Sequence, residues 1–289
     1  MQFIDPHIHL FNLALGQYHW LKPENPPFWP DKNIINSDFT ESDLLTTGEI
    51  ERSGFVHIEA GFDNNKPWKE IQWLESQCKS NFRSVACIDL TLSPQIFSQQ
   101  VSTLLSYKSV VGCRHILDND ASEILKHKNT IINLKQLADK QLSFDLQMSL
   151  SDVSAIKTLC LLLKNIPTLS VIINHAGFPP YFTEIPQSNS VNALFYKYKN
   201  WRAGLQRLSQ FKQCAIKCSG WEITERRYSA LWCKYIIEQC ISDFGMNRVM
   251  LSSNFPLCLF SHTYQNIWQQ YNQLDPHLYL ENAKIWYKF

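Results

Sequence analysis

Eight short runs rich in β-forming residues recur along this chain of 289 residues. They span residues 3–10, 54–61, 82–90, 110–116, 142–148, 169–177, 213–220 and 248–256. Their starts therefore lie between 27 and 51 residues apart. This spacing is too long for hairpins and is typical of strands that alternate with helices.

The stretches between these runs have the features of helices. In residues 67–79, Pro67 stands where a helix begins, and apolar residues such as Ile71 and Leu74 recur at steps of three and four. Similar stretches span residues 38–44, 94–107, 129–139, 152–165, 191–210, 226–244 and 260–273. The alternation predicts an α/β protein with a single (β/α)8 barrel. A doubly wound open sheet is disfavoured, because no G-x-G-x-x-G or G-x-x-x-x-G-K motif follows any run.

Composition limits the kinds of partner. The 27 Lys and Arg residues nearly balance 26 Asp and Glu residues, for a net charge of +1. The chain therefore has no overall field to bind nucleic acid or an anionic membrane. Hydrophobic residues make up 45% and charged residues 18%, which excludes disorder. No low-complexity linker interrupts the sequence, so we expect one domain over residues 1–289.

The nine cysteines do not suggest a disulfide framework. Their number is odd, no C-x-x-C pair occurs, and several lie in apolar runs such as residues 84–88. Buried free thiols in a reducing compartment are the simplest interpretation. The first residues lack the basic and apolar regions of a signal peptide. No apolar run approaches the roughly 20 residues of a membrane span. We therefore expect a cytoplasmic protein.

The first run carries the strongest chemical signal. Asp5, His7 and His9 alternate in D-x-H-x-H, so a regular strand would project all three into the barrel lumen. Two imidazoles at this spacing can share one divalent metal ion, and an acidic neighbour can orient one ring. The alternative is that two histidines in one strand are incidental.

Two later runs end in polar residues. His175 closes the sixth run, where it would be a third ligand at the same mouth of the barrel; the alternative is a histidine bonded to a loop carbonyl. Asn254 closes the eighth run. In a closed barrel the eighth strand lies beside the first, so Asn254 would lie near His7 and His9.

Charged residues occur in three other runs. Arg114 and His115 end the fourth run and point to opposite faces of a regular strand, although a slight twist or a bulge at the strand end could bring both inward. Lys217 lies in the seventh run, and Glu59 lies in the second. A guanidinium at the mouth suits a carboxylate or a polarised carbonyl. An ion-pair network inside the barrel explains Arg114, Lys217 and Glu59 equally well.

Two segments between runs are long and rich in proline and aromatic residues. They span residues 17–35 and 178–190, and neither has a helical pattern. Both follow strands, so we expect them at the C-terminal face of the barrel, where loops form the active site.

Taken in order, these motifs resemble a known family. The order is D-x-H-x-H, G-x-R-H, N-H-x-G, K-x-S-G and S-N-F-P, and the chain ends with Asn282-Ala283 followed by Tyr287. This order resembles the amidohydrolase superfamily, and within it the amidohydrolase-related (amidohydrolase 2) TIM-barrel metal-dependent hydrolases. The most similar branch holds lactonases of the fuconolactonase type and 2-pyrone-4,6-dicarboxylate lactonase. The resemblance covers residues 3–287 and implies fold and superfamily, not substrate.

The resemblance implies catalytic roles for His7, His9, His175 and Asn254, and metal binding by the three histidines. Asn254 stands where the family usually has the Asp that activates the attacking water. An amide is neither an anionic ligand nor a general base at neutral pH. We therefore expect one divalent ion, zinc, to be weakly held or absent. The proton of the water would pass to His175, His115 or Glu59, or a metal-bound hydroxide would form without a carboxylate on the eighth strand.

The leading hypothesis is a hydrolase that opens a small lactone, either a sugar lactone or a carboxylated cyclic ester. Water would attack the ring carbonyl, and Arg114, His115, Lys217 and Glu59 would bind this anionic or sugar-derived substrate. One alternative is a metal-dependent decarboxylase of the same superfamily, against which Asn254 counts. The other is a degenerate barrel that binds a metabolite without turnover. The sequence does not indicate an oligomeric state.

Overall fold

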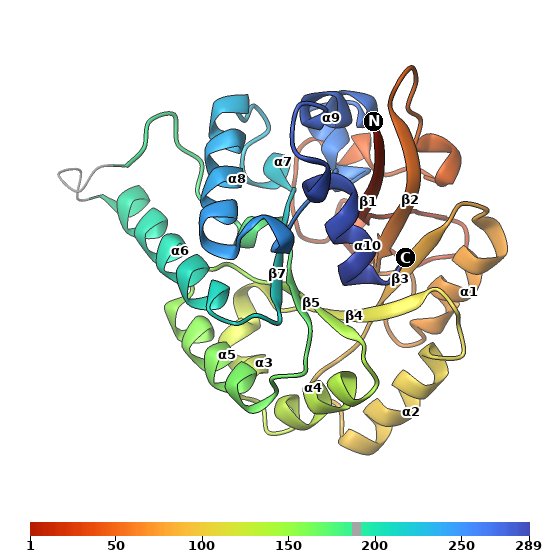
Figure 1. Ribbon diagram of the computed structural model, residues 1–289. Helices are drawn as coiled ribbons and strands as arrows, with labels where there is room; N and C mark the ends of the chain where they lie inside the picture. Colours follow the sequence, from red (N-terminus) through yellow and green to blue (C-terminus); the bar gives the residue numbers. More distant parts are fainter. Residues whose placement is uncertain (187–191) are drawn as a thin grey trace.

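A computed structural model describes residues 1–186 and 192–289. Within these ranges eight parallel strands pair in chain order, from β1 to β8 (Figure 1). The ring closes where Ile8 bridges to Phe255, just after β8, and the His9 N–H donates to the Phe255 carbonyl at 2.6 Å. The predicted (β/α)8 barrel is confirmed. The strands are β1 Gln2–Ile8, β2 Glu51–Ile58, β3 Phe82–Cys87, β4 Val110–Ile116, β5 Ser143–Gln147, β6 Val171–Ile173, β7 Cys214–Cys218 and β8 Val249–Leu251.

The helices surround this ring (Figure 1). Those expected are α1 Trp68–Gln77, α2 Pro94–Leu104, α4 Thr130–Asp139, α5 Val153–Asn165, α6 Ala193–Ser209, α8 Ala230–Phe244 and α9 Tyr264–Tyr271. Three short helices were not predicted: α3 Ala121–Lys126, α7 Trp221–Thr224 and α10 Asn282–Tyr287. The predicted helix at 191–210 and the predicted loop at 178–190 lie partly outside the described residues.

The helix predicted over residues 38–44 is wrong. The structure has a single 3-10 turn at Glu41–Asp43. A hydrogen bond from the Thr40 N–H to the Asp43 carboxylate, at 2.7 Å, caps its start. After Leu44 and Leu45, the residues Thr46, Thr47 and Gly48 offer no apolar side chain that packing on a longer helix would bury, and Gly48 has a φ of +72°.

Strands β6 and β8 are shorter than predicted, and both end just before candidate site residues. The backbone turns left-handed at His175 and Ala176, with φ of 55° and 48°, and at Asn254, with φ of 59°. A strand cannot continue through this conformation, which is uncommon for residues other than glycine. Strained backbone of this kind clusters at functional sites.

The C-terminal helix closes the N-terminal end of the barrel. Ala283 and Tyr287 of α10 pack with the interior residues Ile4, Val56 and Met250. The Tyr287 hydroxyl also reaches the interior, where it donates to Asp145 of β5 at 2.7 Å. The barrel is thus filled from below, and open space remains at its C-terminal mouth.

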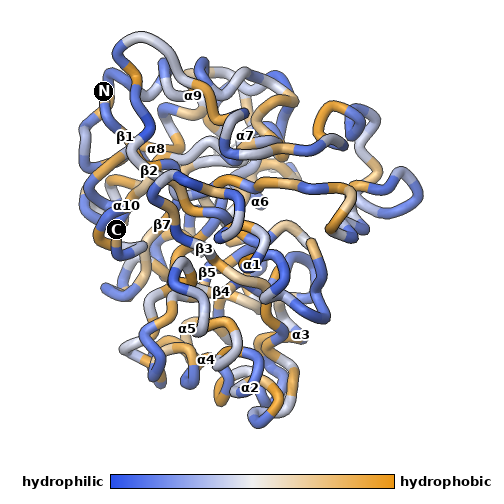
Figure 2. The backbone as a smooth tube through the Cα atoms, turned by 90° about the vertical axis from the view of Figure 1, so that its right-hand side faces the viewer, coloured by the Kyte–Doolittle hydropathy of each residue, from blue (hydrophilic) through white to orange (hydrophobic). Residues whose placement is uncertain are grey.

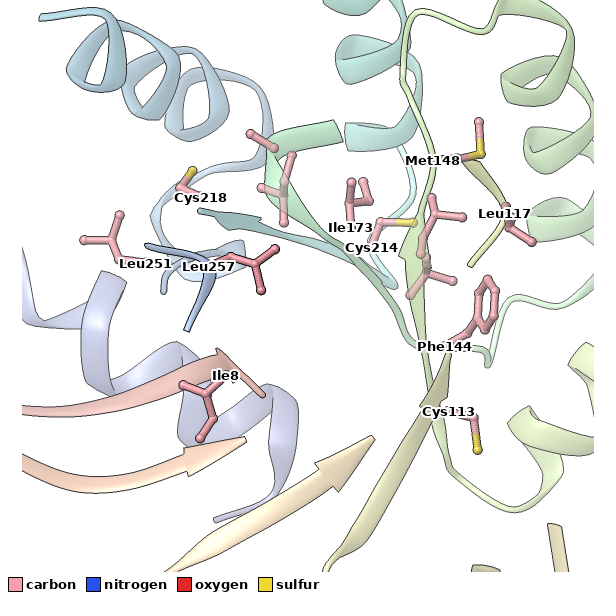
Figure 3. Close-up of a cluster of buried hydrophobic side chains, with 14 of the residues drawn as sticks. Ile8, Cys113, Leu117, Phe144, Met148, Ile173, Cys214, Cys218, Leu251 and Leu257 are labelled. Atoms are coloured by element: carbon pink, nitrogen blue, oxygen red, sulfur yellow. The ribbon is translucent and has the colours of Figure 1, made fainter. Parts of the chain in front are cut away.

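A second hydrophobic core lies between the barrel strands and the surrounding helices, and it contains most of the buried cysteines. All nine cysteines are free thiols, and six of them are buried. Figure 3 shows Cys113, Cys214 and Cys218 within this cluster of buried hydrophobic side chains. Along α2 and α4, hydrophilic and hydrophobic stretches alternate, as expected of helices with one buried face (Figure 2). None of the described helices is long and apolar enough to cross a membrane.

Candidate active site

His7 and His9, in and just after β1, both point into the barrel interior, and His9 reaches the cavity at its mouth. Their Nε2 atoms lie 3.3 Å apart, and the Nδ1 of His9 lies 2.8 Å from the Ile58 carbonyl. The third histidine, His175, has its ring centre 4.6 Å from that of His7. The structure therefore brings together the three histidines that the sequence singled out.

Asp5 does not join them, although strict alternation predicted that it would. A bulge between Asp5 and Ile8 inserts one extra residue on β1 relative to β2, which reverses the alternation. Asp5 instead accepts hydrogen bonds from the Ser253 hydroxyl at 2.5 Å and the Ser253 N–H at 3.2 Å. It therefore ties β1 to the end of β8, and no hydrogen bond in the described chain joins it to an imidazole.

His175 is held by the turn after β7. Its Nδ1 lies 3.0 Å from the Ser219 hydroxyl. Gly220 lies so close that a Cβ added there would be 2.5 Å from the same Nδ1, and its φ of +69° also disfavours a side chain. The K-x-S-G motif thus shapes the wall against which the His175 ring rests, and this leaves the Nε2 of His175 facing the mouth.

Lys217 lies beneath the histidines and is completely buried. Its Nζ is 2.6 Å from Asp145 and 3.3 Å from the Nδ1 of His7. Burial lowers the pKa of Lys217 to about 8, although Asp145 opposes this shift. The ammonium is therefore still protonated at neutral pH, and its charge is matched by the Asp145 carboxylate.

These contacts assign the proton positions of the imidazoles. The Lys217 ammonium donates to the Nδ1 of His7, so neutral His7 carries its proton on Nε2 and donates it to the Nε2 of His9. His9 then carries its proton on Nδ1, which donates to the Ile58 carbonyl. Burial, aided by nearby cations, lowers the pKa of His7, His9 and His175 well below its usual range, so all three rings are neutral.

Arg114 and Glu59 form an ion pair at the other side of the mouth. The Arg114 Nε donates to Glu59 Oε1 at 2.8 Å, its Nη2 to the Glu59 carbonyl at 2.6 Å, and its Nη1 to Gln147 at 2.6 Å. Both side chains are at least 96% buried. Of the two interpretations open from the sequence, the interior ion-pair network therefore describes both Arg114 with Glu59 and Lys217 with Asp145.

His115 points away from the mouth, as strict alternation from Arg114 requires. Its Nδ1 accepts the Leu90 N–H at 3.2 Å, and the ring does not line the cavity described below. No bulge brings it inward, because β4 and β5 pair without a register shift from Gly112 to Ile116. The geometry thus separates His115 from the other residues expected to bind substrate.

Asn254 has a partner that sequence reasoning missed. Its Nδ2 donates to the Glu222 carboxylate at 2.6 Å, and Glu222 is 1% exposed. Burial raises the pKa of Glu222 to about 7. Glu222 belongs to α7, directly after the K-x-S-G motif at the end of β7. That position, at the C-terminal end of a barrel strand, was the signal that could have revealed it.

A cavity of about 750 Å³ opens above these residues. Its floor includes His9, His175, Asn254, Arg114 and Glu59, whereas Lys217 and His7 lie below the lining. Its rim includes Trp20 and Trp29, from the segment at residues 17–35 that was expected at this face. A volume of this size suits a small ligand.

The sequence model of the amidohydrolase family matches residues 4–282 of this chain. The chain belongs to the amidohydrolase family. This confirms the resemblance drawn from the order of the motifs.

Individual relatives and solved structures are distant in sequence. The uncharacterized protein y4mH of Sinorhizobium fredii is 25% identical over 289 residues, covering 94% of this chain and 90% of its own. An amidohydrolase from Burkholderia multivorans, solved with bound zinc, has a TM-score of 0.75 at 15% identity over the full length of both chains. A putative 2-pyrone-4,6-dicarboxylic acid hydrolase from Pseudomonas putida has a TM-score of 0.64 at 18% identity, with 99% and 97% of the two chains covered. At these identities the structural likenesses establish the shared fold.

The residues present do not fit a tightly held metal ion of the kind this family implies. A zinc ion bound by the Nε2 atoms of His7 and His9 would add its charge near the buried Lys217 ammonium, whose Nζ lies 3.3 Å from the Nδ1 of His7. Asn254 offers a neutral oxygen in place of a carboxylate. Across residues 1–186 and 192–289, no group of three or more His, Cys, Asp or Glu side chains has the arrangement of a metal site.

Proposed function

We propose that this amidohydrolase opens a small, uncharged lactone by attack of water on the ring carbonyl. The observation that supports this best is the convergence of His175, Asn254 and Arg114 on one cavity of about 750 Å³. These three side chains offer a proton acceptor, a neutral hydrogen-bond acceptor for water and a cationic donor. A base and a donor to the developing oxyanion are the groups that accelerate ester hydrolysis.

His175 takes the proton in this proposal. Its ring is neutral because burial lowers its pKa, and in this proposal its Nδ1–H donates to the Ser219 hydroxyl oxygen, which leaves Nε2 as the nitrogen that can accept. As the water oxygen bonds to the carbonyl carbon, one water proton passes to Nε2. When the tetrahedral intermediate collapses, the bond from that carbon to the ring oxygen breaks, and His175 returns the proton to that oxygen. The product is a hydroxy acid.

Arg114 stabilises the negative charge on the carbonyl oxygen. A guanidinium has five N–H donors, and three of those on Arg114 are used by Glu59 and Gln147. Two donors therefore remain for a substrate in the cavity that Arg114 lines. Donors already fixed by other bonds need no rearrangement as charge develops, which is the main source of such catalysis.

The charge balance of the cavity favours a sugar lactone over a carboxylated ring. Arg114 is paired with Glu59, and Lys217 is both paired with Asp145 and outside the lining. Asp118 adds a further carboxyl to the wall. In the described lining, therefore, no cation is left unpaired to receive a carboxylate. The same balance disfavours an aromatic carboxylate as the substrate of a decarboxylase.

The aromatic rim supports this choice of substrate. Trp20 is fixed over the cavity by its indole N–H, which donates to the Ala60 carbonyl at 2.8 Å, and its ring packs edge-on against Trp29. Flat apolar faces of this kind pack against the C–H faces of a sugar ring while the hydroxyls bond to polar groups. The nine free thiols favour action in the cytoplasm.

The test is hydrolysis of a panel of aldonolactones and carboxylated lactones, with acid release followed by a pH indicator. We expect turnover of neutral lactones, and His175→Asn should lower kcat by about 100-fold or more. His277→Asn is the matched control, because His277 is exposed and bonded to Asp275. If both variants lose activity equally, His175 is not the base. Ligand binding without turnover on any lactone would instead indicate a non-catalytic barrel.

A further inference from the structure

Glu222 is a buried carboxylate that the hydrolytic steps above do not use. One of its oxygens accepts the Asn254 Nδ2 at 2.6 Å, and its main-chain carbonyl accepts Arg226. The Arg226 guanidinium is directed to Asp31, at 2.8 and 3.1 Å. Glu222 thus differs from Glu59 and Asp145, which each face the cation of a buried ion pair.

The bond to Glu222 decides which way the Asn254 amide points. When ionised, a carboxylate only accepts hydrogen bonds, so it selects the NH2 end of the amide and turns the carbonyl end away. Asn254 Oδ1 is buried and has no hydrogen-bond partner among the described residues. Its residue lines the cavity with His9 and His175, whereas Glu222 does not. The bond to Glu222 thus leaves the oxygen as the end of the amide that is free to bond to a group in the cavity.

The backbone holds Asn254 rigidly for this purpose. Its N–H donates to the His7 carbonyl at 3.0 Å, its own carbonyl accepts the Cys258 N–H at 3.2 Å, and its φ of 59° is left-handed. With the main chain fixed, the side chain retains one main freedom, the exchange of its amide O and N. A buried polar atom without a partner is costly, and such atoms in native proteins call for a ligand or water.

We propose that Glu222 is a positioning residue that locks the Asn254 amide so that its Oδ1 faces the cavity and accepts a hydrogen bond from the attacking water. The water then donates one proton to Asn254 Oδ1 as a hydrogen bond and the other to His175. This arrangement fixes the oxygen lone pair of the water toward the carbonyl carbon. If the amide were reversed, its NH2 end would face the water and compete with that geometry.

The kinetic test rests on the proposed function. In Glu222→Gln, the new amide bonds to Asn254 in either orientation, so Oδ1 no longer faces the cavity in every molecule. We expect kcat to fall by about tenfold to 100-fold with KM changed less than about threefold. Glu225→Gln, which removes a carboxylate bonded to the Arg227 N–H on the same turn, should leave kcat unchanged.

A double substitution tests whether Glu222 acts by orienting residue 254 or whether its replacement merely damages the site. In Glu222→Gln combined with Asn254→Asp, the new amide at position 222 donates to the new carboxylate at position 254, whose other oxygen faces the cavity. The double variant should recover about tenfold or more in kcat over Asn254→Asp alone, where two carboxylates oppose each other. If kcat of the double variant equals the product of the two single losses, the two residues act independently and the proposal is wrong.

A spectroscopic test does not depend on turnover. In protein labelled with 15N-asparagine, the Asn254 side-chain NH2 signal is identified by its loss in Asn254→Asp. A proton bonded to a carboxylate should resonate downfield and exchange slowly with water, and Glu222→Gln should move it upfield. If the signal is the same in both proteins, the lock does not exist. If it moves but no lactone is hydrolysed, the proposed function fails while the inference about Glu222 stands.

Discussion

Glu222→Gln should make the protein more stable at pH 8, even though it impairs the site. Burial raises the pKa of Glu222 from 4.5 to about 7, so the folded state holds this proton more tightly than the unfolded chain. Stability from this group is therefore present below pH 4.5 and is lost as the pH rises toward 7. Ionisation at pH 8 costs about 3 kcal/mol, at about 1.36 kcal/mol for each tenfold change in proton affinity.

Glutamine has nearly the same shape and never ionises, so it removes that cost and can still accept the Asn254 N–H. At pH 5.5 Glu222 is ionised in the unfolded chain but not in the folded protein, and the free-energy cost that Glu222 imposes on folding falls to about 1 kcal/mol. We therefore expect Glu222→Gln to raise the free energy of unfolding by about 3 kcal/mol at pH 8 and by about 1 kcal/mol at pH 5.5.

Urea unfolding followed by tryptophan fluorescence at both pH values measures this difference. Glu123→Gln is the control, because Glu123 is exposed and the same change there should be neutral at both pH values. An equal gain in the free energy of unfolding at both pH values, or a loss at pH 8, would show that ionisation of the buried Glu222 does not destabilise the folded protein.

Other variants probe the metal, the ion pair and the aromatic rim. After dialysis against a mild chelator, Asn254→Asp alone should retain little more zinc than the wild type, because the new carboxylate and Glu222 share a proton. Adding Glu222→Gln should increase zinc retention. Equal stoichiometric zinc in all three proteins would contradict this. Arg114→Met should destabilise the fold by about 3 to 5 kcal/mol, because it leaves the buried Glu59 carboxylate without a partner. Adding Glu59→Gln should restore most of the free energy of unfolding, measured with urea, but it should not restore turnover. Trp29→Ala should raise KM for lactones about tenfold without changing the melting temperature, and an unchanged KM would exclude contact with the ring.

The barrel could be predicted because its signals are local and repeated. Each strand is a short apolar run, and the spacing requires a crossover between runs. The C-terminal helix α10 could not be predicted, because a helix of only six residues has no clear period. It is held in place by tertiary contacts: the Tyr287 hydroxyl donates to Asp145, which lies 142 residues earlier in the chain.

The histidine site could be predicted from the strand ends, but its charge pattern could not. His7, His9 and His175 follow from position alone, since the carboxyl ends of parallel strands meet at one mouth. Whether Arg114 and Lys217 are free cations depends on which carboxylates lie across the barrel. Their partners are 55 and 72 residues away from them in sequence, and no local pattern reveals the pairing. A one-residue bulge was enough to remove Asp5 from the group.

The same charge pattern explains why an asparagine can stand at position 254. If residue 254 were an aspartate, its carboxylate would lie about as close to Glu222 as the amide does now, at 2.6 Å. Two negative charges at that distance repel by about 6 kcal/mol at an effective dielectric constant of about 20, so one of the pair would stay protonated. Asn254 with Glu222 avoids this conflict: the negative charge lies behind the cavity wall, and a neutral oxygen faces the substrate. A wall of this kind accepts hydrogen bonds from water and sugar hydroxyls but offers a metal ion no carboxylate, which is consistent with the proposed opening of a neutral lactone.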